Sequence, residues 1–388
     1  MSLFINDKSY MNILHINYND LVGGRFTGYY MQQSVDKSYN VKMAVWNKSS
    51  QSSHVHLIPP SNPILRFIAD KTMRFSSRLG FDGLIGTGGW ILPTYDFFKK
   101  ADIIHLHLIH GFSNFSILSL PKLSRLKPIV WTLHDPWAMT GGCEHSFECD
   151  RWLTGCSPRC PHPRCTSLFQ HSAPYLHWRI KKKVYQHANL TLVVASQWMQ
   201  DRISRSPLLH HLPCHYIPFG IDLDLFKPKS KTECRKKLGI PSNNKVIAFR
   251  DSGLKTDKFK GLRWLLEALM IYEPKEPTTL LIFEDGKGFN DLSLKYNVIL
   301  KGWVDGEDLV DGLSAADVFL MPSIQESFGL MAVEAMACGT PVIVFEGTAL
   351  PSVIKAPHGG IAVPTKDSPA LAKAIKLLLE DNELRKKL

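Results

Sequence analysis

The chain of 388 residues is long enough for two domains of ordinary size. Apolar residues make up 44% and charged residues 21%, a balance typical of globular proteins that excludes the disordered and fibrous classes. The sequence contains no apolar run long enough to span a bilayer and no basic segment followed by an apolar one at its start, so we expect a cytoplasmic protein without a membrane-spanning helix or signal peptide.

The formal charge of +11 is confined to the first half of the chain. Residues 1–215 contain 23 Lys and Arg against 12 Asp and Glu, whereas residues 216–388 contain 23 of each. Such an excess fits nucleic acid, an anionic membrane surface or a phosphorylated substrate, and it fits equally well a solvated basic face without a partner.

Apolar runs in the first half predict the strands of a parallel sheet. They occupy residues 13–16, 41–46, 103–108, 129–133 and 190–195. A glycine turn, Gly23-Gly24, and a helix-like stretch at residues 28–35 follow the first run, which is the opening of a Rossmann-type unit. Helical stretches between buried runs indicate a sheet covered on both faces.

The turn-rich segment 217–228 predicts a linker between domains 1–216 and 229–388. The alternation then restarts, with strand-like runs at 245–249, 278–283, 297–302, 317–321 and 341–345, and helical stretches at 261–269, 307–315 and 328–337. We therefore predict an α/β fold of two Rossmann-like, doubly wound domains that face each other across a cleft. The last helical stretch, 369–388, has no closing element after it, so we expect the natural protein to continue with a further helix.

A helix with an anion-binding start is predicted within residues 326–341. Ser327 suits the N-cap and Gly339 suits the position just past the C-terminus, so the helix should begin near Phe328. It follows the predicted strand 317–321, and its free N–H groups would point to the carboxyl edge of the sheet, where open α/β sheets bind anions.

Two glutamates lie along this helix. Glu326 is at its mouth, and Glu334 follows eight residues later, about 12 Å away at about 1.5 Å per residue. One carboxylate could hold sugar hydroxyls and the other ribose hydroxyls. Spacing alone favours the simpler interpretation, an amphipathic helix with two solvent-facing acids.

The complete string around these glutamates resembles a known signature. Glu326-Ser-Phe-Gly-Leu, followed by Glu334 and by Gly339-x-Pro341, strongly resembles the donor site of the retaining glycosyltransferases of family four, and weaker matches extend over nearly the whole chain. Members of that family have the two-domain GT-B fold. The resemblance implies that Glu326 contacts the transferred sugar and that Glu334 binds the ribose. It also implies that the backbone of Phe328, Gly329 and Leu330 borders the sugar and diphosphate.

Two basic residues match the phosphate contacts of the same family. A nucleoside-diphosphate leaving group gains negative charge as the glycosidic bond breaks, and a transferase has to stabilise it. The family uses an Arg after the first strand of the second domain and a Lys before a Gly at the next helix, which here are Arg250 and Lys260. The intervening loop is longer than usual and contains Lys255 and Lys258, which leaves open the alternative of surface basic residues. No catalytic metal or other cofactor is implied.

The acceptor side is expected in the first domain. The family places a His near the reaction centre, which corresponds to His134 at the end of the predicted strand 129–133; the alternative is a strand-end His bonded to backbone. Asp135 and Trp137 follow this histidine. We expect them, together with the glycine loop of Gly23 and Gly24, to contact the acceptor or the diphosphate. Four other histidines lack such a context and are expected to be packing or surface residues: His15, His105, His107 and His110.

Five cysteines cluster in a predicted insert at about residues 140–165 of the first domain: Cys143, Cys149, Cys156, Cys160 and Cys165. Part of their spacing fits a structural zinc site, and reduced thiols without a ligand are the alternative expected in a cytosolic protein. The stretch resembles an insert in family members of bacterial polysaccharide assembly, of the colanic-acid type, and we expect it to shape the acceptor pocket.

Residues 65–78 alternate basic and apolar side chains. Arg66, Lys71, Arg74 and Arg78 lie among Phe67, Ile68 and Phe75. This pattern suits a helix lying on an anionic membrane surface, and it also suits an ordinary helix packed by its apolar side.

The sequence thus predicts a retaining glycosyltransferase that transfers a hexose-type sugar from a nucleoside diphosphate to a glycan or polyprenyl-linked glycan in surface polysaccharide biosynthesis. We expect it in the cytoplasm, with possible peripheral attachment to the inner face of the membrane, and we expect no nucleic-acid partner. The alternatives are a nucleotide-sugar epimerase on the same scaffold and a catalytically inactive glycan-binding subunit. The base, the sugar, the acceptor and the linkage stay open.

Overall fold

The computed structural model describes residues 10–27, 29, 39–59, 62–111, 113–156, 160, 173–250, 257–283 and 290–388. The chain divides into two units, and each is described here by itself. The first consists of residues 1–195 and 199–218, and the second of residues 219–388 with 196–198. The division after Pro218 falls within the segment 217–228 that was predicted as a linker.

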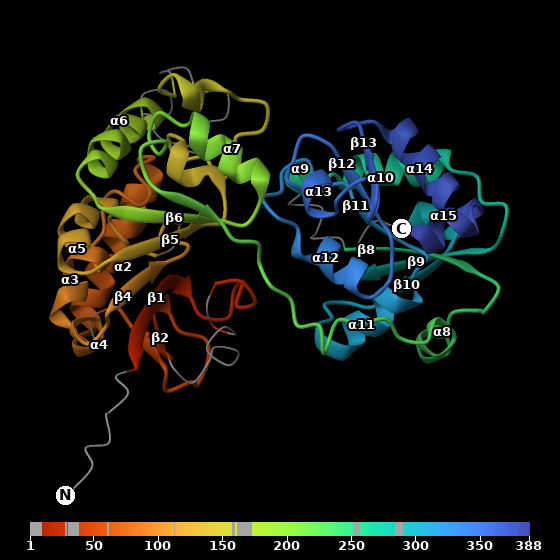
Figure 1. The fold of residues 1–388 in the computed structure, drawn as a ribbon, viewed down its shortest axis with the longest axis horizontal. Helices are drawn as coiled ribbons and strands as arrows, with labels where there is room; N and C mark the ends of the chain where they lie inside the picture. The colour runs from red at the N-terminus through yellow and green to blue at the C-terminus, as the bar shows by residue number, and fades with distance from the viewer. Residues whose placement is uncertain are drawn as a thin grey trace, which may run out of the picture. The chain divides into compact units, whose positions relative to one another are not determined.

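The first domain is built on a parallel sheet of seven strands in the order β3-β2-β1-β4-β5-β6-β7 (Figure 1). The strands are β1 (Met11–Asn19), β2 (Tyr39–Asn47), β3 (Val55–Leu57), β4 (Ile103–Leu106), β5 (Ile129–Leu133), β6 (Leu190–Val194) and β7 (Cys214–Tyr216). The strand order reverses between β1 and β4, which is the topological switch point of a doubly wound sheet.

The helices of the first domain connect these strands. They are α2 (Pro63–Arg78), α3 (Gly88–Ile91), α4 (Asp96–Lys99), α5 (Leu120–Leu126), α6 (Ala173–Gln186) and α7 (Gln197–Arg205). The five predicted strands are confirmed, whereas the short edge strands β3 and β7 were not predicted. The helix predicted at residues 28–35 lies outside the described residues, apart from Tyr29.

The second domain repeats the same plan with six parallel strands in the order β10-β9-β8-β11-β12-β13. The strands are β8 (Lys245–Arg250), β9 (Thr278–Phe283), β10 (Asn297–Leu300), β11 (Val318–Met321), β12 (Val342–Phe345) and β13 (Gly360–Val363). The helices are α8 (Lys231–Leu238), α9 (Asp257–Lys260), α10 (Leu262–Ile271), α11 (Gly306–Ala315), α12 (Leu330–Ala337), α13 (Leu350–Val353), α14 (Ser368–Glu380) and α15 (Asn382–Lys387). The switch point lies between β8 and β11, and the predicted fold of two doubly wound α/β domains is confirmed.

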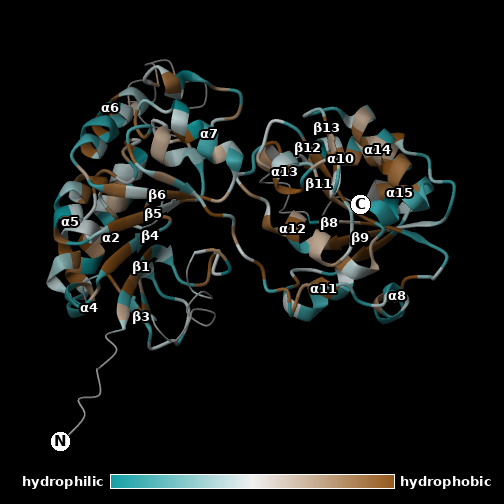
Figure 2. Cartoon of the chain, in the orientation of Figure 1, coloured by the Kyte–Doolittle hydropathy of each residue, from teal (hydrophilic) through white to brown (hydrophobic). Residues whose placement is uncertain are grey.

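The strands β9 and β12 are buried along their whole length because helices cover both faces of a parallel sheet. All six residues of β9 and all four of β12 are buried. Figure 2 shows the strands mainly in the brown of hydrophobic residues, whereas the helices combine hydrophobic brown with hydrophilic teal. Within the part of the chain that the structure describes, no helix has the length and apolar character needed to cross a membrane.

The start of α12 differs from the prediction. Ser327 is not its N-cap; that position belongs to Gly329, whose φ of 90° lies in the left-handed region. A Cβ at this position would approach Leu350 Cδ2 to 2.2 Å, so that side chain would have to shift, and the left-handed backbone conformation itself favours glycine. The predicted end of the helix is confirmed, since Gly339 follows the C-cap with a φ of 77°.

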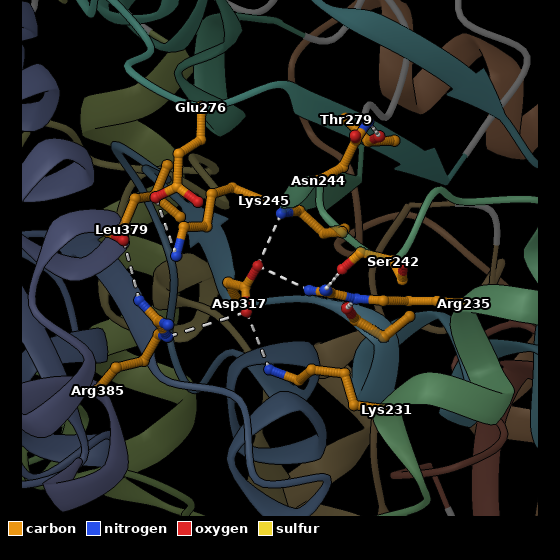
Figure 3. Close-up of polar contacts among 12 residues, drawn as sticks. Lys231, Arg235, Ser242, Asn244, Lys245, Glu276, Thr279, Asp317, Leu379 and Arg385 are labelled. Carbon is orange, nitrogen blue, oxygen red and sulfur yellow. Dashed lines mark hydrogen bonds and ion pairs between the residues drawn. The ribbon is translucent and has the colours of Figure 1, made fainter.

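A buried carboxylate ties four elements of the second domain together (Figure 3). Asp317 directly precedes β11 and has a side chain that is 6% exposed. Its Oδ2 accepts from Arg235 of α8 at 2.7 Å and from the backbone N–H of Val246 in β8 at 2.8 Å. Its Oδ1 accepts from Lys231 at 3.1 Å and lies 3.9 Å from Nε of Arg385 in α15.

Candidate donor site and histidine cluster

The residues predicted to bind a donor diphosphate gather at the switch point of the second domain. Arg250 is the last residue of β8, and the neighbouring strand β11 ends at Met321, just before the segment 322–326. Ligands of open α/β sheets bind at the carboxyl ends of the two strands that flank the switch point. Both parts of the predicted site are therefore at the edge of the sheet where a ligand is expected.

Helix α9 is attached to the segment that carries Glu326. The carbonyl oxygen of Phe259 accepts from the backbone N–H of Ile324 at 2.8 Å and of Gln325 at 3.2 Å. The next residue, Lys260, then reaches Glu326, with 2.9 Å between Nζ and Oε2. The side chain of Lys260 is 41% exposed and that of Glu326 is 16% exposed, so this ion pair is within reach of a ligand from solvent.

Gly261 makes this close approach possible. Its φ is 72°, and a Cβ there would lie 2.0 Å from the carbonyl oxygen of Pro322. Any other residue would have to move the backbone after β11 and with it Glu326. The close approach to Pro322 therefore explains why a glycine follows Lys260 in this chain.

Arg250 is held by the loop after β10. Its guanidinium donates to the carbonyl oxygen of Val304 at 2.7 Å, and it lies over the ring of Trp303 at 4.3 Å from the centroid. These contacts fix the direction of the side chain, which is partly exposed. The loop that contains Lys255 lies outside the described residues.

The predicted contacts on α12 differ in exposure. Leu330 begins the helix and is partly exposed, whereas Phe328 is 6% exposed. Glu334 is completely buried, so the expectation of two acids open to a ligand is met only at Glu326. The role of Glu334 in ribose binding stays a prediction.

In the first domain, the glycine loop follows β1 as predicted. Gly23 has a φ of 67°, and a Cβ there would approach the ring of Phe26 to 2.8 Å. The backbone N–H of Gly24 donates to Leu21 O at 2.9 Å, which closes the turn. Glycine is needed at position 23 for the turn itself, and a contact of this loop with diphosphate or acceptor stays a prediction.

His134, Asp135 and Trp137 lie at the end of β5 in three different environments. His134 is partly exposed. Asp135 caps a short 3-10 helix by accepting from the N–H of Trp137 at 2.8 Å, and its other oxygen lies 3.0 Å from Nε2 of His110. Burial acts against a charge on His110, but the carboxylate of Asp135 outweighs it and raises the pKa of this imidazole. His110 therefore pairs with the carboxylate of Asp135, a role that its sequence context did not indicate.

The ring of Trp137 is completely buried and packs against the side chain of Lys181 in α6. The Lys181 Nζ lies 3.4 Å from the ring centroid and donates to the carbonyl oxygens of Trp137 and Thr140. Trp137 thus serves the core of the first domain, and its contact with an acceptor stays a prediction. Burial lowers the pKa of Lys181 to about 7.

The buried Lys181 predicts a pH dependence of stability. The unfolded chain binds this proton up to about pH 10.4, whereas the folded chain releases it above about pH 7, so unfolding takes up a proton in this window. The free energy of unfolding should therefore rise with pH between these values, by up to about 1.4 kcal/mol per pH unit. In the Lys181→Met variant, the free energy of unfolding measured with urea should not show this rise with pH. The matched control is Lys183→Met on the exposed side of α6, which should keep it.

Four histidines come together near the switch point of the first domain. The sequence had indicated no functional role for three of them, and it had indicated His134 only as a separate residue. His15 of β1 pairs in register with His105 of β4, and His107 follows two residues later. Nδ1 of His15 lies 2.7 Å from Nε2 of His107, and Nδ1 of His107 lies 3.0 Å from Nε2 of His134. The rings form a continuous chain of contacts from the middle of β1 to the end of β5.

All four imidazoles are neutral at physiological pH. Burial lowers the pKa of His105 to about 4 and that of His134 to about 3. Burial places the pKa values of His15 and His107 well below the usual 6.5, and repulsion would add to this effect if a neighbouring imidazole became protonated. One signal in the sequence could have indicated this cluster: His105-x-His107 places both rings on one face of a strand.

Of the cysteines of the predicted insert that the structure describes, Cys149 and Cys156 are free thiols. The Sγ of Cys156 accepts from the N–H of Gly141 at 3.2 Å, and burial raises the pKa of this thiol to about 11. Cys165 lies outside the described residues. Zinc binding by this cluster stays a prediction, and the deprotonation that zinc requires is disfavoured at Cys156.

The second domain can be compared with known families. Residues 230–388 match the protein-family model described as "Glycosyl transferases group 1". We refer to this segment as the group 1 domain. The match contains the complete switch point with Arg250, Lys260 and Glu326.

Curated relatives share part of the chain. The D-inositol 3-phosphate glycosyltransferase of Corynebacterium jeikeium is 31% identical over 223 residues, which are 53% of this chain and 52% of the relative. The chain spans about half the length of the curated relatives it matches. The alignment thus supports kinship with glycosyltransferases, while the activity of the whole protein is a matter for proposal.

Solved structures share both domains. The Anabaena protein Alr3699/HepE, solved with UDP and glucose, superposes with a TM-score of 0.64 at 18% identity over 97% of this chain and 92% of its own. WaaG, a glycosyltransferase involved in lipopolysaccharide biosynthesis, superposes with a TM-score of 0.60 at 15% identity over the same shares. These likenesses show that the group 1 domain and the first domain together have the GT-B fold.

Proposed function

We propose that this protein is a retaining glycosyltransferase that transfers a sugar from a nucleoside diphosphate to a glycan or lipid-linked glycan in surface polysaccharide biosynthesis. The observation that carries the proposal is the ion pair of Lys260 and Glu326 at the switch point of the group 1 domain, where β8 ends in Arg250. Two cations placed there can stabilise the charge of a departing diphosphate, and a carboxylate beside them can accept from sugar hydroxyls.

The comparisons support a nucleotide-sugar donor. A structural neighbour was solved with UDP and glucose, and curated relatives are named glycosyltransferases. For the acceptor, one neighbour is described as acting in lipopolysaccharide biosynthesis and one relative is named for inositol 3-phosphate. We favour a glycan acceptor because the Cys-rich insert resembles polysaccharide-assembly members of the family.

Thermal unfolding with UDP, GDP, ADP and NAD tests the donor site first. A nucleoside diphosphate at about 100 times its dissociation constant should stabilise the protein by about 2.7 kcal/mol. Glu334→Gln keeps the size of the buried side chain and should weaken this stabilisation if the carboxylate binds ribose. Lys376→Ala, exposed on α14, should leave it unchanged. Stabilisation by NAD alone would contradict the proposal.

Incubation of the complete protein with radiolabelled sugar donors then separates the alternatives. A glycosyltransferase releases the nucleoside diphosphate and gives a product whose anomeric configuration matches the donor. An epimerase would change the sugar without steady transfer to a glycan. An inactive subunit would bind the nucleotide and release nothing.

We also propose that α2 attaches the first domain to an anionic membrane surface. Five of its apolar side chains are between 53% and 70% exposed: Ile64, Leu65, Phe67, Ile68 and Phe75. The same helix carries Arg66, Lys71, Arg74 and Arg78, of which all are exposed. Exposed apolar side chains beside basic ones match the interface of a bilayer with anionic headgroups.

Sedimentation with vesicles tests this attachment. The protein should bind vesicles that contain phosphatidylglycerol, and Phe67→Ser should weaken binding by about 10- to 100-fold, because a buried Phe contributes about 1.5–3 kcal/mol. Leu377→Ser removes an apolar side chain of comparable exposure from α14 and serves as the control. Equal binding of both variants, or binding to neutral vesicles alone, would refute the attachment through α2.

A further inference from the structure

Three histidines of the first domain offer metal ligands at one place. His15 and His105 lie opposite each other on β1 and β4, and side chains two residues apart in a strand share a face, which places His107 beside them. The N–H of His107 donates to Ile16 O at 2.9 Å, so the strand pairing continues past the end of β4. One ring nitrogen of each histidine lies within 4.8 Å of the other two. Among the residues that the structure describes, this is the one group of three or more ligands so close together.

We propose that His15, His105 and His107 form a binding site for one divalent transition-metal ion, with Zn²⁺ as the best match. Three imidazoles suit Zn²⁺ and its neighbours in the first transition row, whereas Mg²⁺ and Ca²⁺ prefer oxygen ligands. His15 is 2% exposed and His107 is 3% exposed, whereas His105 is partly exposed, so a water molecule on the side of His105 would be the fourth ligand of a tetrahedral ion.

The distances require a small rearrangement. Zn–N bonds of about 2.0 Å in tetrahedral geometry place the ligand nitrogens about 3.3 Å apart. Nδ1 of His15 and Nε2 of His107 are now 2.7 Å apart, joined by a hydrogen bond. This pair has to open by about 0.6 Å for Zn–N bonds of the usual length, and the other nitrogens, which are up to 4.8 Å apart, have to approach by up to about 1.5 Å. The ion then replaces one hydrogen bond by bonds to both nitrogens.

The surroundings hold the rings as metal ligands are usually held. Histidines bound to a metal commonly use the other ring nitrogen in a hydrogen bond that fixes their tautomer. Here Nδ1 of His107 lies 3.0 Å from Nε2 of His134, and Nε2 of His105 lies 2.7 Å from Oγ1 of Thr132. With the metal on Nε2 of His107, its Nδ1 carries the proton and donates to His134.

Protons compete little with the ion at neutral pH. A metal binds the neutral imidazole, and a histidine that is already neutral loses no affinity to protonation. Burial lowers the pKa of His105 to about 4 and places those of its two partners well below the usual value. This supports the proposal, which stands on the geometry of the three rings.

A Co²⁺ titration of the chelator-treated full-length protein tests the site. Cobalt should bind with one ion per chain, give the visible spectrum of tetrahedral or five-coordinate nitrogen ligation without thiolate charge-transfer bands, and be displaced by Zn²⁺. His15→Gln and His105→Gln should each weaken binding by about a hundredfold, at the upper end of what the loss of a supporting contact causes. His187→Gln, exposed after α6, is the matched control and should bind like the wild type.

The cysteine cluster is the rival ligand set, and the same experiment separates the two. Cys143→Ser and Cys156→Ser should leave the affinity and the spectrum unchanged. Thiolate charge-transfer bands, affinities that the histidine variants do not change, or no binding by the wild type would each overturn the proposal. Far-UV circular dichroism checks that the variants fold. If neither histidine variant folds, the presence and ligand type of the wild-type cobalt spectrum decide.

Discussion

Lys260→Ala and Arg250→Ala should each lower the rate of sugar transfer by roughly 10²–10³-fold, the loss typical of removing one preorganised group that stabilises charge in a transition state. Lys260 is positioned by α9, and Arg250 by the end of β8 and the loop at Trp303. Both cations lie at the switch point of one domain, where the leaving diphosphate is proposed to bind. The measurement is the steady-state turnover of the proposed donor and acceptor.

The stability of these variants distinguishes a catalytic role from a structural one. The Lys260–Glu326 pair is partly exposed, and pairs of that kind contribute about 0–1 kcal/mol to stability. Lys260→Ala should therefore unfold at nearly the wild-type temperature while its turnover falls. Lys260→Arg keeps the charge and should recover part of the rate, and Lys376→Ala should have full activity. A Lys260→Ala enzyme with normal turnover would remove the main support of the proposed function.

Asp317→Asn should destabilise the second domain by about 3–5 kcal/mol, the usual effect of breaking a buried ion pair by removing one charge. Asn has nearly the same shape but cannot neutralise Arg235, whose side chain is only 11% exposed. The contacts to α8, β8 and α15 in Figure 3 all depend on this carboxylate. Urea unfolding of the full chain measures the change.

Asp308→Asn is the matched control for Asp317→Asn. Asp308 is 69% exposed and lies 3.5 Å from Lys237, so its loss should change stability by about 0–1 kcal/mol.

The dependence of stability on acid pH offers a second test of Asp317. Burial alone would raise the pKa of Asp317, but Lys231, Arg235 and the N–H of Val246 outweigh it and lower the pKa. The carboxylate therefore stabilises the fold above its unfolded pKa of about 3.9, and this contribution disappears as the pH falls through the lower folded value. Equal urea midpoints for Asp317→Asn and Asp308→Asn would contradict the central role of Asp317.

The sequence was most informative where burial alone determines structure. β12 and residues 280–283 of β9 are continuous apolar runs because both faces of these strands are covered, and such runs can be recognised in the sequence alone. The edge strands β3 and β7 have three residues each, too few for a pattern. The start of α12 was placed two residues early because Ser327 is a good N-cap by residue type, whereas the chain turns into the helix through a left-handed backbone conformation at Gly329.

The candidate site was predictable in composition and less so in arrangement. Resemblance indicated Lys260 and Glu326, but their contact spans 66 residues and depends on the hydrogen bonds of Phe259. The histidine cluster was missed because it requires the register between β1 and β4, which brings together residues 92 positions apart. Strand register of that kind is decided by the packing of the whole sheet.

The attachment of α9 has a mechanical consequence. One carbonyl, that of Phe259, holds two successive amides of the segment that leads to Glu326, and Gly261 leaves no gap to Pro322. Helix α9 cannot lift without freeing both amides, and the segment cannot shift without pushing on the glycine. We therefore expect Lys260 and Glu326 to move together when a ligand binds to either of them.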